Sequence, residues 1–146
     1  MYLKLTNGVP EKYSIGQLRR DNPQTSFPKQ ISDDVLASYD VYPYTRPTYG
    51  EYDQLAWRVV DGDFEQDSNG NWSLPWVLQA RPLGEAQDRV RTERDSLISE
   101  TDWRVIKAYE RSENLPAEWE LYRQALRDIT SQEGFPFNVT WPTAPT

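Results

Sequence analysis

Residues 116–129, with the sequence PAEWELYRQALRDI, decide the helical half of the fold. Proline is favoured in the first turn of a helix, so Pro116 is well placed to begin one. Gly134 and Pro136 are expected to end it. Large apolar residues recur at steps of three, four and three, which places them on one helix face: Trp119, Tyr122, Leu126 and Ile129. The pattern therefore predicts an amphipathic helix.

An earlier helix is predicted from Gly84 to the neighbourhood of Thr101, about four turns long. Its apolar stripe is broken by Arg94 and consists of Ala86, Val90, Leu97 and Ile98. Two readings of the later helix stay open. Its apolar face either packs against this helix, leaving Arg123 and Arg127 outward, or it forms a docking surface for a partner. The regularity of the stripe favours packing.

Residues 54–80, QLAWRVVDGDFEQDSNGNWSLPWVLQA, predict a β-hairpin because apolar residues alternate on both sides of Asn69-Gly70. A three-residue loop, Ser68-Asn69-Gly70, sets Phe64 opposite Leu74 and Val60 opposite Leu78. We favour this register because a shift by one residue would bury acidic side chains.

The first 50 residues predict short elements separated by turns. An opening strand contains Leu3 and ends at Asn7-Gly8, a strong turn dipeptide. Ser14 stands three residues before Gln17, the spacing of a capping box, so helical turns are expected over residues 15–20. Ser32 is expected to cap a second short helix over residues 33–39.

Two further segments complete the predicted fold. Residues 42–47 carry two prolines and are expected to form an extended connector, and residues 139–141 a short final strand. The chain is therefore expected to be an α+β protein, a small N-terminal β-containing domain with a β-hairpin followed by a C-terminal two-helix unit. The expected division is 1–82, 83–142 and a disordered tail, 143–146.

The composition excludes several classes of function. The 146 residues contain no cysteine and no histidine, which removes thiol nucleophiles, disulfides, imidazole bases and histidine-ligated zinc. A net charge of −7 argues against nonspecific nucleic-acid binding. No apolar run approaches the roughly 20 residues of a membrane span, and no secretory signal is expected. Six tryptophans, nine tyrosines and 12 arginines fit either a protein interface or an aromatic core.

Short motifs that could carry chemistry are weak. Ser26 and Lys29 match an S-x-x-K nucleophile motif, but Pro28 opposes the helix that this motif needs. Four acidic residues lie near tryptophans, a composition that sugar-binding sites share: Asp61, Asp63, Glu65 and Asp67. A hydrolase that acts on sugars through these carboxylates is therefore a distant third hypothesis. Residues 67–71 are similar to the start of a calcium loop, but position six, which requires glycine, is Trp72, and position twelve, which requires glutamate, is Leu78. We therefore expect no catalytic residue, no metal, no cofactor and no nucleotide site.

Arg19 and Arg20 are adjacent and follow a capped turn. They either grip carboxylates or carbonyls of a partner or pair with the acidic residues of this chain, and the acidic composition favours the second reading.

Four segments, in order, resemble the phage tail assembly chaperone family: Arg94-Asp95-Ser96-Leu97, Thr101-Asp102-Trp103, residues 119–129 (WELYRQALRDI) and residues 135–142 (FPFNVTWP). The resemblance spans residues 93–142. Residues 13–23 (YSIGQLRRDNP) and 25–28 (TSFP) also resemble the N-terminal half of related phage proteins.

The resemblance implies a non-catalytic chaperone that acts without ATP and binds the distal part of a trimeric phage tail fibre protein. It implies action in the host bacterial cytoplasm during infection, with retention on the virion left open. The alternative is a permanent structural subunit of the tail fibre or baseplate. Candidate partner-binding residues are Arg19, Arg20, Trp103, Trp119, Tyr122, Arg123, Arg127, Phe135 and Trp141. No nucleic acid, membrane or nucleotide partner is expected.

Overall fold

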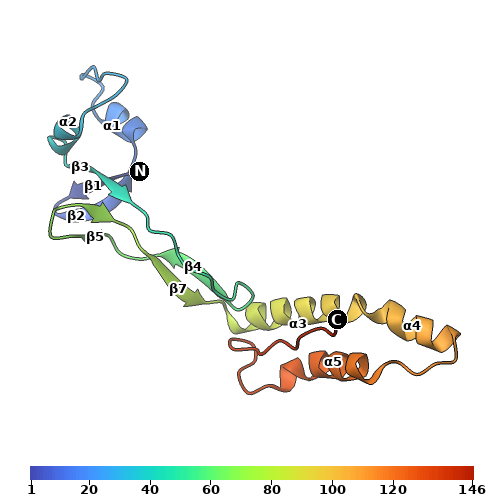
Figure 1. Ribbon diagram of the computed structural model, residues 1–146. Coiled ribbons are helices and arrows are strands. Elements are labelled where there is room, and N and C mark those ends of the chain that lie inside the picture. The colour runs from blue at the N-terminus through green and yellow to red at the C-terminus, as the bar shows by residue number, and fades with distance from the viewer. The chain divides into compact units, whose positions relative to one another are not determined.

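The computed structural model describes residues 1–146 and has a mixed α+β fold, which confirms the predicted fold class (Figure 1). Two compact units are present. One consists of Met1–Gly50 and Val59–Val77, and the other of Glu51–Arg58 and Leu78–Thr146. Each unit therefore takes two separate stretches of the chain. The sequence-based division at residue 82 and the disordered tail stay predictions.

The first unit is built on a five-stranded sheet of order β2-β1-β3-β6-β5. The strands are β1 (Tyr2–Thr6), β2 (Val9–Tyr13), β3 (Val41–Thr45), β5 (Glu65–Gln66) and β6 (Trp72–Ser73). β1 is antiparallel to β2 and β3, whereas β3 and β6 run parallel. Asn7 and Gly8 both have positive φ, 54° and 81°, so they form the tight turn predicted between β1 and β2.

The prediction that residues 42–47 form a connector is wrong, because residues 41–45 are the strand β3 in the middle of the sheet. Only Pro43 among the prolines lies inside this strand. Its neighbours still form the ladder, since the backbone N–H of Tyr44 donates to the Met1 carbonyl at 3.0 Å. Valine, tyrosine and threonine favour strands strongly enough to offset one missing donor.

The hairpin register near the loop is confirmed. Glu65 lies opposite Ser73 and Gln66 opposite Trp72, which is the register of the three-residue loop and sets Phe64 opposite Leu74. Farther from the loop the hairpin continues as β4 (Trp57–Asp61) and β7 (Trp76–Ala80), which form a separate two-stranded sheet.

Two short helices accompany the five-stranded sheet. α1 (Ile15–Asp21) has the predicted capping box, with hydrogen bonds between Ser14 and Gln17 in both directions. α2 (Asp33–Ala37) ends two residues before the predicted end at Tyr39. Ser32 precedes α2 but its side chain makes no capping hydrogen bond, so that part of the prediction is wrong.

Apolar residues pack on both faces of the five-stranded sheet, because successive residues of a strand point to opposite sides. One core cluster contains Leu3, Tyr44 and Leu74. The other cluster joins Leu18 and Leu36, from α1 and α2, to Val41. The two helices therefore cover one face of the sheet.

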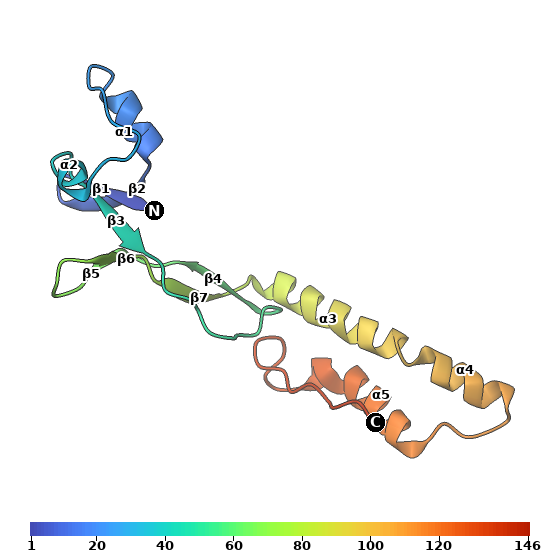
Figure 2. The same cartoon turned by 45° about the horizontal axis from the view of Figure 1, so that its top comes forward.

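The second unit contains α3 (Leu83–Ser99), α4 (Asp102–Glu110), α5 (Ala117–Arg127) and a 3-10 turn, η1 (Asp128–Ser131). Figures 1 and 2 show α5 running back alongside α3. The prediction of two helices missed α4, and the region near Thr101 is a break between two helices rather than the end of the only early one. Thr101 is buried at this break.

The predicted apolar face of α5 is the core of the second unit. Trp119, Tyr122, Leu126 and Ile129 are buried together with Val90 of α3. The strand predicted at residues 139–141 is wrong. The Gln132 side-chain amide donates to the carbonyl of Thr140 and accepts from its N–H, each at 2.8 Å. These are the backbone hydrogen bonds that a neighbouring strand would otherwise make.

Candidate partner-binding surface

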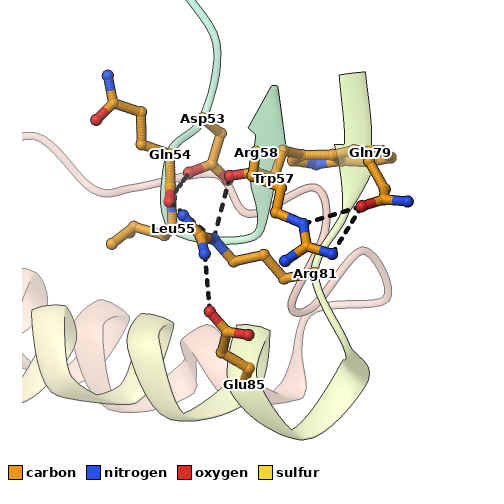
Figure 3. A network of polar contacts seen from close by, with 8 residues as sticks. All are labelled: Asp53, Gln54, Leu55, Trp57, Arg58, Gln79, Arg81 and Glu85. Atoms are coloured by element: carbon orange, nitrogen blue, oxygen red, sulfur yellow. Dashed lines mark hydrogen bonds and ion pairs between the residues drawn. The ribbon is translucent and has the colours of Figure 1, made fainter. Parts of the chain in front are cut away.

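Arg81 holds residues 51–58 against the beginning of α3, as Figure 3 shows. Its Nε donates to the carbonyls of Trp57 at 3.1 Å and Gln54 at 3.3 Å, and its Nη1 pairs with Glu85 at 2.7 Å. The Arg81 backbone N–H also donates to the Ala56 carbonyl at 2.9 Å. This network attaches residues 54–57 to the beginning of α3.

Trp57 connects the same segment to the stretch of chain that follows η1. Its indole Nε1 donates to the Phe137 carbonyl at 2.9 Å, and the two rings pack edge to face with centroids 5.8 Å apart. Leu55 packs against the helical core. Residues 51–58 are thus part of the scaffold that supports α3 and α5.

Arg123 occupies the break between α3 and α4 instead of pointing outward. It is only 8% exposed, and its Nη1 donates to the Ile98 carbonyl at 3.1 Å and to the Thr101 hydroxyl. Its Nη2 pairs with Asp102 at 2.9 Å. The positive charge of Arg123 is favourable at the C-terminal end of α3, and the negative charge of Asp102 is favourable in the first turn of α4. The expectation that Arg123 faces solvent is therefore wrong.

Helix α4, held in this way, presents an apolar surface to solvent. Trp103, Val105, Ile106 and Tyr109 are 52%, 39%, 57% and 85% exposed, and we call these four residues the α4 face. Only Ala108 of this helix is buried. Four exposed large apolar side chains on one nine-residue helix are unusual for a surface without a partner.

A pocket lies beside the α4 face, between α4 and α5. It is lined by Trp103, Arg104, Lys107, Ala108, Glu113, Asn114, Pro116 and Trp119. The Arg104 guanidinium lies over the Trp119 ring at 3.8 Å and over the Trp103 ring at 4.5 Å from the centroids. Lys107 lies 5.7 Å from the Trp103 centroid. We call this the Arg104 pocket.

The other candidate residues lie in different surroundings. Arg19 and Arg20 are exposed on α1, and Arg19 donates to the Pro28 carbonyl at 2.9 Å. Arg127 is exposed at the end of α5. Phe135 and Trp141 are half-buried against the helical core. Among the nine candidates, the helical core brings together Trp119, Tyr122, Phe135 and Trp141. Arg123 and Arg127 line one surface pocket, and Trp103 joins Trp119 in the Arg104 pocket.

Two of the four acidic residues of the hairpin, Asp61 and Asp67, have structural partners. Hydrogen bonding by Lys12, followed by that of Arg46, lowers the pKa of Asp61. Asp67 accepts backbone hydrogen bonds from Asn69 and Asn71 within the hairpin loop, and the Asn71 side chain lowers its pKa. A general acid for glycoside hydrolysis needs a raised pKa, so neither carboxyl suits that role.

Sequence reasoning did not single out Arg104, Lys107, Ile106 or Tyr109 because it did not predict α4. A signal was present: Asp102 begins the segment, and Trp103, Ile106 and Tyr109 follow at steps of three. The nearness of the preceding helix concealed it, since a nine-residue helix directly after another has no turn residues to announce it.

Residues 87–146, which form α3 from its second turn onward, α4, α5 and the segment after them, match the family model described as phage tail assembly chaperone protein. The match confirms the resemblance found in residues 93–142, and the family name indicates a chaperone of phage tail assembly. The α4 face and the Arg104 pocket both lie inside the matched region. Neither a curated protein nor a solved structure matches the chain.

No helix of the structure combines the length and the apolar character that crossing a membrane requires.

Proposed function

We propose that this chain binds a phage tail fibre polypeptide through the α4 face and assists its folding or trimerisation without catalysis or ATP. The observation that carries the proposal is the exposed apolar surface of α4 within the region that matches the chaperone family. A fibre chain before trimerisation exposes apolar strands and unpaired edges that aggregate. An apolar helix face can cover such a segment.

The arrangement of the scaffold supports this assignment. Trp119 and Tyr122 are used in the core, and Arg123 fixes the break before α4, so the helix is positioned by buried contacts rather than by its exposed side. The apolar side chains of the α4 face are therefore available to contact the tail fibre polypeptide, which is the client of this chain. We propose that this happens in the host cytoplasm while the tail is assembled.

The test is co-expression with the tail fibre gene of the same phage. Soluble trimeric fibre, measured by size exclusion with light scattering, is expected only when this chain is present. The double substitution Ile106→Ser with Tyr109→Ser should abolish that effect. Leu83→Ser is the matched control, because Leu83 is 56% exposed on α3, close to the 57% of Ile106.

Three results would contradict the proposal in different ways. Soluble trimer without this chain would remove the chaperone function. Full activity of the double variant would remove the α4 face as the binding surface. Fixed stoichiometry of this chain in purified virions, without any effect on fibre folding, would favour a permanent tail subunit.

A further inference from the structure

Arg104 differs from the other arginines that are at least partly buried. Five of these six pair with a carboxylate of this chain: Arg46 with Asp61, Arg81 with Glu85, Arg91 with Asp88, Arg94 with Asp95 and Arg123 with Asp102. The Arg104 guanidinium forms no ion pair and donates no hydrogen bond to this chain, although the chain has 23 acidic residues. Arg104 is therefore the exception among these six arginines, because the other five form ion pairs within the chain.

The contacts that Arg104 does make hold it in place without satisfying it. Trp103 and Trp119 cover the guanidinium, but an indole offers only an N–H donor and no acceptor. The cation–π contacts restrict the side chain and leave its N–H groups open to solvent, with no acceptor from this chain. An arginine that is already oriented loses little entropy when a planar anion binds to it.

The charge of the pocket selects the kind of anion. Arg104 and Lys107 supply two positive charges, and Glu113 supplies one negative charge in the same lining. The chain as a whole is acidic, with a net charge of −7. This balance suits one singly charged, planar anion and opposes phosphate groups or a nucleic-acid backbone.

We propose that the Arg104 pocket binds the carboxylate of an Asp or Glu side chain of the tail fibre polypeptide. This inference rests on the proposed function, because it names the group that the client places beside the α4 face. The methylene part of such a side chain can lie against Trp103 while the carboxylate meets Arg104 and Lys107. A chain-terminal carboxylate is attached directly to Cα, so it has no methylene part between it and the backbone that could lie against Trp103.

Lys107 makes a direct test possible. It is the only lysine in residues 51–146, and a carbodiimide links a lysine amine to a carboxylate only when the two are in contact. The amide forms between Nζ and the carboxylate, and the carbodiimide takes up the elements of water to give a urea. The purified complex of this chain with the tail fibre polypeptide is treated in this way and analysed by peptide mass spectrometry. We expect Lys107 linked to an Asp or Glu side chain of the fibre.

Binding measurements with variants complete the test. Arg104→Met keeps an apolar stem between the indoles and is expected to weaken fibre binding by about 10- to 100-fold, the effect of losing one charged hydrogen-bonded pair. Lys107→Gln changes an exposed side chain, so its smaller loss of affinity cannot be attributed to unfolding. Arg89→Gln is the matched control, since Arg89 is exposed on α3 outside the pocket, and it should bind normally.

The outcomes separate this inference from the proposed function. If the wild-type chain does not bind the fibre, the proposed function fails first. If it binds, and both Arg104→Met and Lys107→Gln bind equally well, the carboxylate pocket is wrong while the chaperone function stands. A link from Lys107 to the α-carboxylate at the end of the fibre would overturn the side-chain source.

Discussion

Arg123 of α5 donates a hydrogen bond from Nη2 to Oδ1 of Asp102, the first residue of α4, at 2.9 Å. The same guanidinium bonds the Ile98 carbonyl near the end of α3. One side chain therefore connects all three helices of the matched region. The helix that presents the α4 face to solvent is held at its beginning by this contact.

Replacing Arg123 with Met should destabilise the protein by about 2–3 kcal/mol, because the buried hydrogen bonds from this charged donor to the Thr101 hydroxyl and the Ile98 carbonyl are lost. Asp102→Asn should cost less than about 1 kcal/mol, since the Asp102 side chain is 54% exposed. Urea denaturation of both variants checks this. Equal losses would show that the ion pair, rather than the buried hydrogen bonds, carries the stability.

Ser112→Gly should stabilise the protein by about 0.5–1 kcal/mol. Ser112 has φ of 53° at the end of α4, where the Glu113 N–H donates to the Ala108 carbonyl at 2.9 Å. This is the Schellman ending, which favours glycine because a side chain disfavours positive φ. The gain is reduced by the greater flexibility of glycine in the unfolded chain. Thermal denaturation measures it, and Ser112→Ala, which keeps a Cβ, should show no gain.

Arg81→Met should loosen residues 51–58 without unfolding the whole protein. The substitution removes the side-chain bonds to the Gln54 and Trp57 carbonyls and the ion pair with Glu85. Amide hydrogen exchange is then expected to increase over residues 53–58 and to change little in α5. Arg58→Met serves as the control, because the exposed Arg58 bonds only the Gln79 side chain. Unchanged exchange in Arg81→Met would show that Trp57 and Leu55 hold the segment alone.

Tyr13 should make stability depend on alkaline pH. Burial, together with a hydrogen bond to Asp21, raises the pKa of Tyr13 from 10.0 to about 12. The folded state therefore favours the neutral phenol, and this contribution is complete below pH 10 and is lost as the pH rises toward 12. Denaturation of wild type and Tyr13→Phe across this range isolates the effect. The two proteins should converge in stability as the phenol ionises, and a constant difference would contradict it.

The elements that the sequence predicts correctly are those with strong local signals. Asn7-Gly8 allows little except a tight turn, and the Ser14–Gln17 spacing places the cap of α1. The period of Trp119 and its partners is long enough to identify the buried face of α5. In each case neighbouring residues carry the whole signal.

The elements that were missed or wrong depend on distant residues. Strand β3 exists because β1 and β6 pair with it on either side, which no local pattern around Pro43 indicates. Residues 139–141 fail to form a strand because Gln132 takes the hydrogen bonds of Thr140. Arg123 is charged and was expected outside, yet the helix break that it bonds lies more than 20 residues earlier in the chain. The Arg104 pocket likewise needs two helices to come together.

The bond between the Trp57 indole and the Phe137 carbonyl spans 80 residues, so it has a consequence for synthesis on the ribosome. The β unit can be completed once residues 1–77 are made, but residues 51–58 must wait for a partner that is synthesised 80 residues after Trp57. At about 5–20 residues per second, that delay is about 4–16 s. A chain released before Phe137 leaves Trp57 without its acceptor and its ring contact. The helical unit therefore reaches its finished form only in a chain translated past Phe137, so products terminated before that residue would lack a complete client-binding unit.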